Sequence, residues 1–500
     1  MNKPSIFQNT AVVTVIACLE RALGFLYRIV LARLLGAEGL GIYQIALSHF
    51  FLFQTVVGGG IPVSLSRTVS RLNAENQGKH AGGALLSALL LAGGISLPIL
   101  GIFLPLIDKI PLFAAEAPVL KILLGSLTAT AAYMAIKGFF WGNKQFLSPA
   151  LFEIVEEIST VLLGVVLLTS KQNLSSMEGA CRAAWAHSIA AVVVCAIACI
   201  TLLLRRIKRS SPVPFLKPLT KAAAPITAVR FSATLVNAAV SALLPAMLIR
   251  AGMPQSDALQ AFGVATGMVM PLVCIPLTMI GSLAIVLVPE LAEDHQKRNA
   301  KQLQEKVEKG VFFALALPCL LIPLFMAVGE PTAAFLYQND LAGEMLPRIA
   351  FLLLPMSVNA ILVSILNSLG FERHTFAFSL IGSAALLVCI LFLPDKVGVY
   401  AYPIGTFVSL MIEVVCGWRL LKKHCPLPRR FYRKALLCIG LTAPLGLVGQ
   451  ILYKGASLFL GAWQSTLCAA LLLSFSIVAF GVLFRLLPPI KNRKKFLHTP

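Results

Sequence analysis

The chain has 500 residues, of which 58% are hydrophobic and only 13% are charged, and its mean hydropathy is +0.85. Soluble domains carry roughly 25% charged residues, so this composition excludes a soluble protein and indicates one that crosses a membrane many times. The formal net charge of +21 would suit a nucleic-acid-binding protein. Its distribution along the chain instead follows membrane topology and attraction to lipid surfaces, and we expect no nucleic acid partner.

Apolar runs of about 20 residues, the length that crosses ~30 Å of hydrocarbon as a helix, recur from one end of the chain to the other. The short alternating segments of a membrane β-barrel are absent. We therefore predict an all-α polytopic membrane protein with fourteen transmembrane helices. The expected spans are 10–33, 41–66, 81–107, 119–141, 151–169, 181–204, 222–249, 258–289, 310–336, 346–369, 375–393, 399–421, 435–453 and 463–487.

The distribution of lysine and arginine predicts the orientation of these spans. With the N-terminus in the cytoplasm, 29 of the 42 basic residues fall in cytoplasmic segments or the span ends next to them, and 8 in external loops or the span ends next to them. This asymmetry follows the positive-inside rule and places both termini in the cytoplasm. We interpret the first span as a retained helix, because no small-residue cleavage site follows a clean apolar core.

Two basic loops divide the chain. The Pro-rich loop 205–221 follows six expected spans, and the loop 419–434 follows twelve. We predict a first six-helix lobe (1–210), a second six-helix lobe (211–425), and two further helices with a basic cytoplasmic tail (426–500). Both lobes start on the same side of the membrane, which is a recurring transporter plan with the substrate site between the halves.

The first span carries charges that a bilayer-crossing helix should avoid. Arg21 and Arg28 are seven residues apart and share one helix face, with Gly24 between them. A charge near the bilayer centre costs at least ~2.5–3.5 kcal/mol, so this face should line a bundle interior or a water-filled cavity and attract an anion. Glu20 either joins this site or neutralises one arginine. Arg33 lies near the outer end and can snorkel to the head groups.

The fifth span opens with PALFEIVEEISTV, which places Glu153, Glu156 and Glu157 in its first two turns. Three interpretations stay open. The carboxylates form a solvated helix start that the helix dipole stabilises, they couple transport to a proton or cation, or they pair with an arginine.

Two isolated intramembrane charges occur later, Arg230 in the seventh span and Glu413 in the twelfth. An intramembrane ionisable residue is by default a functional-site hypothesis, so Arg230 joins the candidate substrate-binding residues and Glu413 the candidate coupling residues or charge partners. Lys137 is a weaker candidate because it could lie near an interface. Asn359 is better explained by a hydrogen bond between helices.

The chain contains no HExxH, GxSxG or phosphate-binding P-loop motif. Most of the eleven cysteines lie inside apolar runs, without CxxC spacing, and are expected to pack as small hydrophobes. We therefore expect no catalytic residue, no metal site and no cofactor. A transporter without a nucleotide site uses an ion gradient, a lipid gradient or consumption of its product, and the identity of any coupling ion stays open.

Three stretches carry a family resemblance: RALGFLYRIVLARLLGAEGLGIYQIA (21–46), GGGIPVSLSRTVSRL (58–72) and FGVATGMVMPLVCIPLTMIGSLAIVLVPELAED (262–294). Together they resemble the stage V sporulation protein B-type branch of polysaccharide exporters. That branch belongs to the multidrug/oligosaccharidyl-lipid/polysaccharide (MOP) superfamily, which also contains the lipid II flippase MurJ and the O-antigen flippases.

This resemblance implies a V-shaped pair of six-helix lobes around a central cationic cavity, in a monomer of the bacterial cytoplasmic membrane. Alternating access would flip a polyprenyl-diphosphate-linked saccharide, lipid II-like or another cell-wall or polysaccharide precursor, and Arg21 and Arg28 would hold its diphosphate. The chain departs from the family pattern at Thr160, where relatives commonly carry arginine. It also lacks an acid between 231 and 249, where they often carry aspartate.

Two other functions compete with a flippase. A cation-coupled multidrug exporter of the same superfamily should prefer acids in its cavity, so the two arginines oppose it and the three glutamates of the fifth span support it. A membrane-embedded glycan polymerase or ligase would need catalytic residues in a sizeable external loop, and the external loops expected here are too short.

Overall fold

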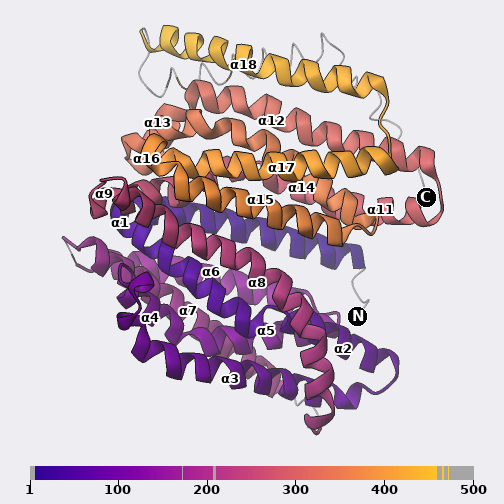
Figure 1. Cartoon of the computed structure of the whole chain (residues 1–500). Coiled ribbons are helices and arrows are strands. Elements are labelled where there is room, and N and C mark those ends of the chain that lie inside the picture. The colour runs from indigo at the N-terminus through magenta and orange to yellow at the C-terminus, as the bar shows by residue number, and fades with distance from the viewer. Residues whose placement is uncertain are drawn as a thin grey trace. The chain divides into compact units, whose positions relative to one another are not determined.

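The computed structural model describes residues 6–171, 173–205, 210–458, 464, 466 and 471. Within these residues every regular element is a helix (Figure 1). Nine helical runs of the described chain are long and apolar enough to cross a membrane, and a tenth is added when two consecutive helices bent by 43° count as one span. The protein is therefore an all-α polytopic membrane protein, as its hydropathy predicts. The fourteenth expected span lies almost wholly outside the described residues.

Packing divides the chain into two units, Met1–Met268 and Val269–Pro500. The α-helices of the first unit are α1 (Ile6–Gly58), α2 (Ile61–Ala74), α3 (Ala81–Leu106), α4 (Ala117–Gly125), α5 (Leu127–Gly142), α6 (Leu147–Thr169), α7 (Ser176–Leu204), α8 (Val213–Arg250) and α9 (Gln255–Phe262). Three short 3₁₀ turns, η1 (Gly78–His80), η2 (Ile107–Lys109) and η3 (Pro111–Phe113), lie on either side of α3. A π-helical segment, η4 (Gly263–Val269), follows α9 and leads into the second unit.

The α-helices of the second unit are α10 (Met270–Cys274), α11 (Leu277–Gln296), α12 (Ala300–Tyr337), α13 (Asp340–Ile349), α14 (Leu353–Ser368), α15 (Glu372–Phe392), α16 (Pro394–Val397), α17 (Ala401–His424) and α18 (Arg429–Ser457). The 3₁₀ turns η5 (Ala350–Leu352) and η6 (Gly398–Tyr400) complete it. Its core contains fully buried side chains of α11, α12, α14 and α18, among them Ile280, Val311, Ile361 and Phe431.

The first thirteen expected spans lie largely on helix, with interruptions. The fourth bends by 43° at Ser126, and the eighth contains η4 and a turn at Ile275–Pro276. Two junctions also differ from the prediction. The first two spans are two helices, both included in α1, that meet without a loop at a kink at Gly36, where φ is 68° and ψ is 176°. A positive φ suits glycine because it has no Cβ. The second span ends at Gly58 rather than near residue 66, because the chain turns at Gly59–Gly60 before α2 begins.

Small residues allow the helices of the first unit to approach closely. The buried face of α7 consists largely of alanines, including the fully buried Ala183, Ala184 and Ala190. Without a hydrophobic driving force between helices in lipid, such close van der Waals packing stabilises their association. The helix α8, which is the seventh expected span, packs against α1, α2 and α3 and is grouped with the first unit. The division into six, six and two helices remains a prediction.

Two helices cross closely where α1 meets α9 and the start of η4. A Cβ on Gly41 would lie 2.2 Å from the Leu259 carbonyl oxygen, and one on Gly263 would lie 2.1 Å from the Ala37 carbonyl oxygen. Both opposing atoms belong to the backbone, which cannot move aside without shifting a helix.

We expect Gly41→Ala to lower the free energy of unfolding by about 1–3 kcal/mol through overpacking. Thermal unfolding of the detergent-solubilised protein measures the change. Gly101→Ala on α3 is the matched control, because a Cβ at that position meets nothing within 4 Å. Equal transition temperatures for the two variants would contradict this packing.

Candidate functional site

The candidate site begins with the two arginines of α1. The side chains of Arg21 and Arg28 are both exposed, and neither makes a hydrogen bond or an ion pair with a described residue of the chain. Their seven-residue spacing places them on one face, ~10 Å apart along the helix axis. A guanidinium group offers five N–H donors in a fixed fork, so both side chains have donors available for an anion.

A glutamate of α6 approaches α1 between these arginines. A Cβ on Gly24 would lie 3.0 Å from Glu157 Oε1, so the carboxylate rests against the glycine that separates Arg21 from Arg28 along the face. Glu157 interacts electrostatically with Arg28 and with Glu20. The absence of a side chain at Gly24 therefore brings a carboxylate and the arginine face together.

Lys137 of α5 connects this cluster to a third helix. Its Nζ forms an ion pair with Glu153 Oε1 of α6, and both side chains are largely buried. The same ammonium group lies 4.9 Å from the centre of the Trp141 ring, within range of a cation–π interaction. From the sequence Lys137 was a weaker candidate, although it stands near the end of α5 and Glu153 near the start of α6.

The remaining acids interact within the same group of side chains. Glu20 interacts electrostatically with Arg21, Lys137 and Glu153, and Glu156 interacts with Lys137 and with the other three glutamates. We call this group the α1–α6 charge cluster: Glu20, Arg21, Arg28, Lys137, Glu153, Glu156 and Glu157. It contains three basic and four acidic side chains, so it is a mixed cluster rather than a purely cationic one.

The ion pair between Lys137 and Glu153 predicts a measurable coupling. Lys137→Met is expected to destabilise the protein by about 1–3 kcal/mol, because it leaves a largely buried carboxylate without its partner. The double variant Lys137→Met/Glu153→Met should recover part of that loss, giving a coupling energy of about 0.5–3 kcal/mol in a double-mutant cycle of thermal unfolding. The exposed pair Lys171–Glu178 is the control, with an expected coupling below ~1 kcal/mol. Additive effects at Lys137 and Glu153 would contradict this assignment.

The structure places the other two candidate residues outside this cluster. Arg230 of α8 is exposed, and its Nη1 donates a hydrogen bond of 2.8 Å to the carbonyl oxygen of Gly59, in the break between α1 and α2. Glu413 of α17 belongs to the second unit, where its Oε2 accepts a hydrogen bond of 2.7 Å from Asn359 Nδ2 of α14. Gly382 of α15 leaves room for the Glu413 carboxylate, because a Cβ at this position would lie only 2.8 Å from Glu413 Oε1.

One further buried pair was not predicted from the sequence. His49 Nδ1 of α1 lies 2.9 Å from Glu116 Oε1, directly before α4, and both side chains are almost fully buried. Phe113 packs edge-on against the His49 ring. Sixty-six residues separate the partners, so no spacing pattern in the sequence could have joined them. The described part of the chain contains no group of three or more His, Cys, Asp or Glu side chains arranged to hold a metal ion.

The fold and the cluster define a class of protein: an all-helical membrane protein whose intramembrane charges gather where α1 meets α5 and α6. The family is then shown by comparison with known proteins. The family model described as polysaccharide biosynthesis protein matches residues 6–295, which is more than half of the chain. The chain belongs to this family.

The related proteins agree with this membership. The chain is 23% identical over 461 residues to stage V sporulation protein B of Bacillus subtilis, with 87% of each chain covered. It is 21% identical over 518 residues to the lipid II flippase MurJ of the same organism, covering 96% of this chain and 94% of that one.

The solved structures show the same fold. An inward closed structure of lipid II flippase MurJ matches with a TM-score of 0.69 and 14% identity, covering 95% of this chain and 99% of that one. An inward-facing multidrug resistance MATE family transporter of the MOP superfamily also has a TM-score of 0.69, with 15% identity, covering 81% of this chain and 94% of that one. The chain therefore shares the fold of these two structures.

Proposed function

We propose that the protein flips a polyprenyl-diphosphate-linked saccharide, a cell-wall or polysaccharide precursor, across the bacterial cytoplasmic membrane by alternating access. The observation that carries this proposal is the pair of exposed arginines on one face of α1, Arg21 and Arg28, without hydrogen-bonding partners among the described residues. Guanidinium groups bind phosphate oxygens bidentately, so two of them on one helix face suit a diphosphate. The protein acts as a monomer with both termini in the cytoplasm.

The four acids of the α1–α6 charge cluster have a role in this proposal. An arginine pair without nearby acids would hold a diphosphate tightly and release it slowly. Glu157 interacts with Arg28, and Glu20 with Arg21, so each arginine has a neighbouring carboxylate that competes with the substrate. The cluster therefore favours moderate affinity and release on the far side of the membrane.

A cation-coupled multidrug exporter is the second candidate function. The observation that favours it is the excess of acids in the cluster, four carboxylates against three basic groups. In such a protein an organic cation would bind to Glu156 or Glu157, and the arginines would serve only to neutralise the remaining acids.

A binding measurement in lipid nanodiscs separates the two functions. The ligands are a polyprenyl-diphosphate saccharide, the same saccharide on a polyprenyl monophosphate, and ethidium as an organic cation. We expect the diphosphate to bind about tenfold more tightly than the monophosphate, because a second phosphate gains charge-assisted hydrogen bonds. Ethidium should not compete with it. Tight ethidium binding together with equal, weak binding of both lipids would reject the flippase in favour of the exporter.

A further inference from the structure

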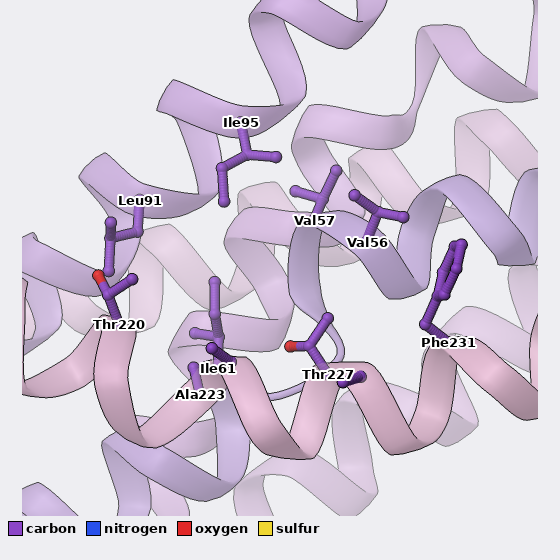
Figure 2. Close-up of a pocket in the computed structure, with 11 residues that line it drawn as sticks. Val56, Val57, Ile61, Leu91, Ile95, Thr220, Ala223, Thr227 and Phe231 are labelled. Atoms are coloured by element: carbon purple, nitrogen blue, oxygen red, sulfur yellow. The ribbon is translucent and has the colours of Figure 1, made fainter.

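The first unit contains an apolar pocket with no carboxylate among its lining residues. Its volume is about 410 Å³, and its walls come from α1, α2, α3 and α8. Figure 2 shows Val57, Ile61, Leu91 and Ile95 facing one strip of α8 that ends at Phe231. Apart from two threonines, every lining residue is apolar. A pocket of this size lies in the range of ligand sites, ~300–1,000 Å³.

One end of the pocket can be located along the helices. The starts of α3 and α8 lie side by side, because Ser87 Oγ donates a hydrogen bond of 2.6 Å to the carbonyl oxygen of Pro212. The amide of Gly83 also donates to Ser210 Oγ at 2.8 Å. The distribution of lysine and arginine assigns this end to the cytoplasm. The pocket therefore extends from the cytoplasmic side of the first unit into the membrane.

Basic side chains outnumber acidic ones at this end, where Glu75, directly after α2, pairs with Arg71. Lys217 and Lys221 of α8 are exposed. Because Lys217 precedes Ala224 by seven residues, it shares the helix face that lines the pocket. Arg67 of α2 is also exposed. The helices α2, α3 and α8 contain no aspartate or glutamate at all, so the potential at this end of the pocket is positive.

The dimensions suit one leaflet of a membrane. Fourteen residues separate Lys217 from Phe231 at the far end of the lining, which corresponds to ~21 Å along α8. One leaflet, with its head-group layer, is about half of the ~40–45 Å of a whole bilayer, or ~20–22 Å. A phospholipid whose head group lies at the lysines would therefore place its acyl chain along the pocket, towards Phe231.

We infer that the pocket binds one acyl chain of an anionic phospholipid of the cytoplasmic leaflet, with its phosphate at Lys217 and Lys221. Each basic residue near a membrane surface adds to the attraction of anionic lipid. The bound chain fills the space between α3 and α8, on the side of α8 that also contacts the Gly59–Gly60 break. The lipid would thereby stabilise the docking of α8 in the first unit and make transport depend on anionic lipid. This inference does not rest on the substrate proposed above.

The test uses photoactivatable lipids with the purified full-length protein in nanodiscs. Phosphatidylglycerol, phosphatidylcholine and a polyprenyl phosphate, each with a diazirine in its chain, are crosslinked in turn, and labelled residues are mapped by mass spectrometry. We expect phosphatidylglycerol to label residues 91–95 and 220–231. Ala224→Phe, which fills the pocket, should abolish this labelling, and Ala222→Phe, outside the lining, should leave it unchanged. The surface double variant Lys217→Gln/Lys221→Gln should weaken phosphatidylglycerol labelling about tenfold. The control double variant Lys422→Gln/Lys423→Gln should leave this labelling unchanged.

Three results of these labelling experiments would overturn the inference of a phospholipid site. Equal labelling by phosphatidylcholine would remove the anionic selectivity and overturn the inference. Displacement of phosphatidylglycerol from these residues by the polyprenyl phosphate would assign the pocket to the substrate chain instead. Wild-type labelling in both Ala224→Phe and the lysine double variant would show that no site exists here. If labelling is as expected and no lipid-linked saccharide binds, the lipid site stands and the proposed transport function fails.

Discussion

Replacing Arg28 with alanine is expected to weaken the binding of a polyprenyl-diphosphate saccharide by about 30- to 100-fold. A hydrogen bond to a charged group contributes ~1.5–3 kcal/mol, and ~1.4 kcal/mol is a tenfold change in affinity. Arg28 is exposed on the face that it shares with Arg21 and has no described hydrogen-bonding partner, so the truncation leaves no buried partner behind. The loss should therefore appear in binding and transport rather than in the thermal stability of the protein.

Two variants sharpen this test. Arg28→Lys keeps the positive charge but loses the bidentate fork, and its affinity should lie between those of the wild type and the alanine variant. Arg250→Ala removes an exposed arginine at the end of α8 and should bind like the wild type. If Arg28→Ala binds the diphosphate lipid as the wild type does, Arg28 has no part in substrate binding.

Replacing Glu157 with glutamine is expected to have the opposite effect on affinity. Its carboxylate rests against Gly24, between the two arginines along α1, and interacts with Arg28. A unit charge ~10 Å from the substrate contributes ~1.7 kcal/mol at an effective dielectric constant of ~20. Removing this repulsion should tighten diphosphate binding about 10- to 20-fold. Release should slow by a similar factor, so the maximal transport rate should fall.

Binding kinetics separate the two parts of this prediction. Surface plasmon resonance on immobilised nanodiscs should give a lower dissociation rate for Glu157→Gln, with little change in the association rate. Glu372→Gln at the start of α15, exposed and in the second unit, is the control and should leave both rates unchanged. Weaker diphosphate binding by Glu157→Gln would mean that this carboxylate positions Arg28 for the substrate rather than competing with it.

Hydropathy was sufficient to find the helices but not their junctions. The first thirteen expected spans lie largely on helix, because a segment of about 20 apolar residues satisfies its backbone in lipid only as a helix. The tight junction between the two helices of α1 was not predicted, since it depends on one glycine, Gly36, with a positive φ. The break at Gly59–Gly60 lies inside an apolar run, where hydropathy does not change.

The helical period predicted part of the candidate site. The spacing of Arg21 and Arg28 places both on one face of α1 within a single helix, which the sequence alone can show. The approach of Glu157 to Gly24 and the ion pair of Lys137 with Glu153 depend on how α1, α5 and α6 pack. Such contacts between helices have no signature in one sequence.

The two isolated charges, Arg230 and Glu413, have different kinds of hydrogen-bonding partner in the structure. Arg230 donates a hydrogen bond to the backbone carbonyl of Gly59, which lies in the break between helices α1 and α2. A backbone partner of this kind cannot be predicted from the pattern of side chains in the sequence. Glu413 accepts a hydrogen bond from Asn359, which matches the expectation that Asn359 bonds between helices. The substrate-binding role of Arg230 and the coupling role of Glu413 remain predictions.

The most direct test of the central proposal, transbilayer transport of a lipid-linked saccharide, uses proteoliposomes that contain the purified protein and a fluorescent polyprenyl-diphosphate saccharide. The measured quantity is the fraction of fluorophore that a membrane-impermeant quencher reaches over time, compared with protein-free liposomes. The proposal predicts a fraction that rises from about one half towards completion only when wild-type protein is present, with a much slower rise for Arg28→Ala. A fraction that stays at one half with the wild-type protein, while the same vesicles accumulate ethidium, would contradict the flippase and support a multidrug exporter.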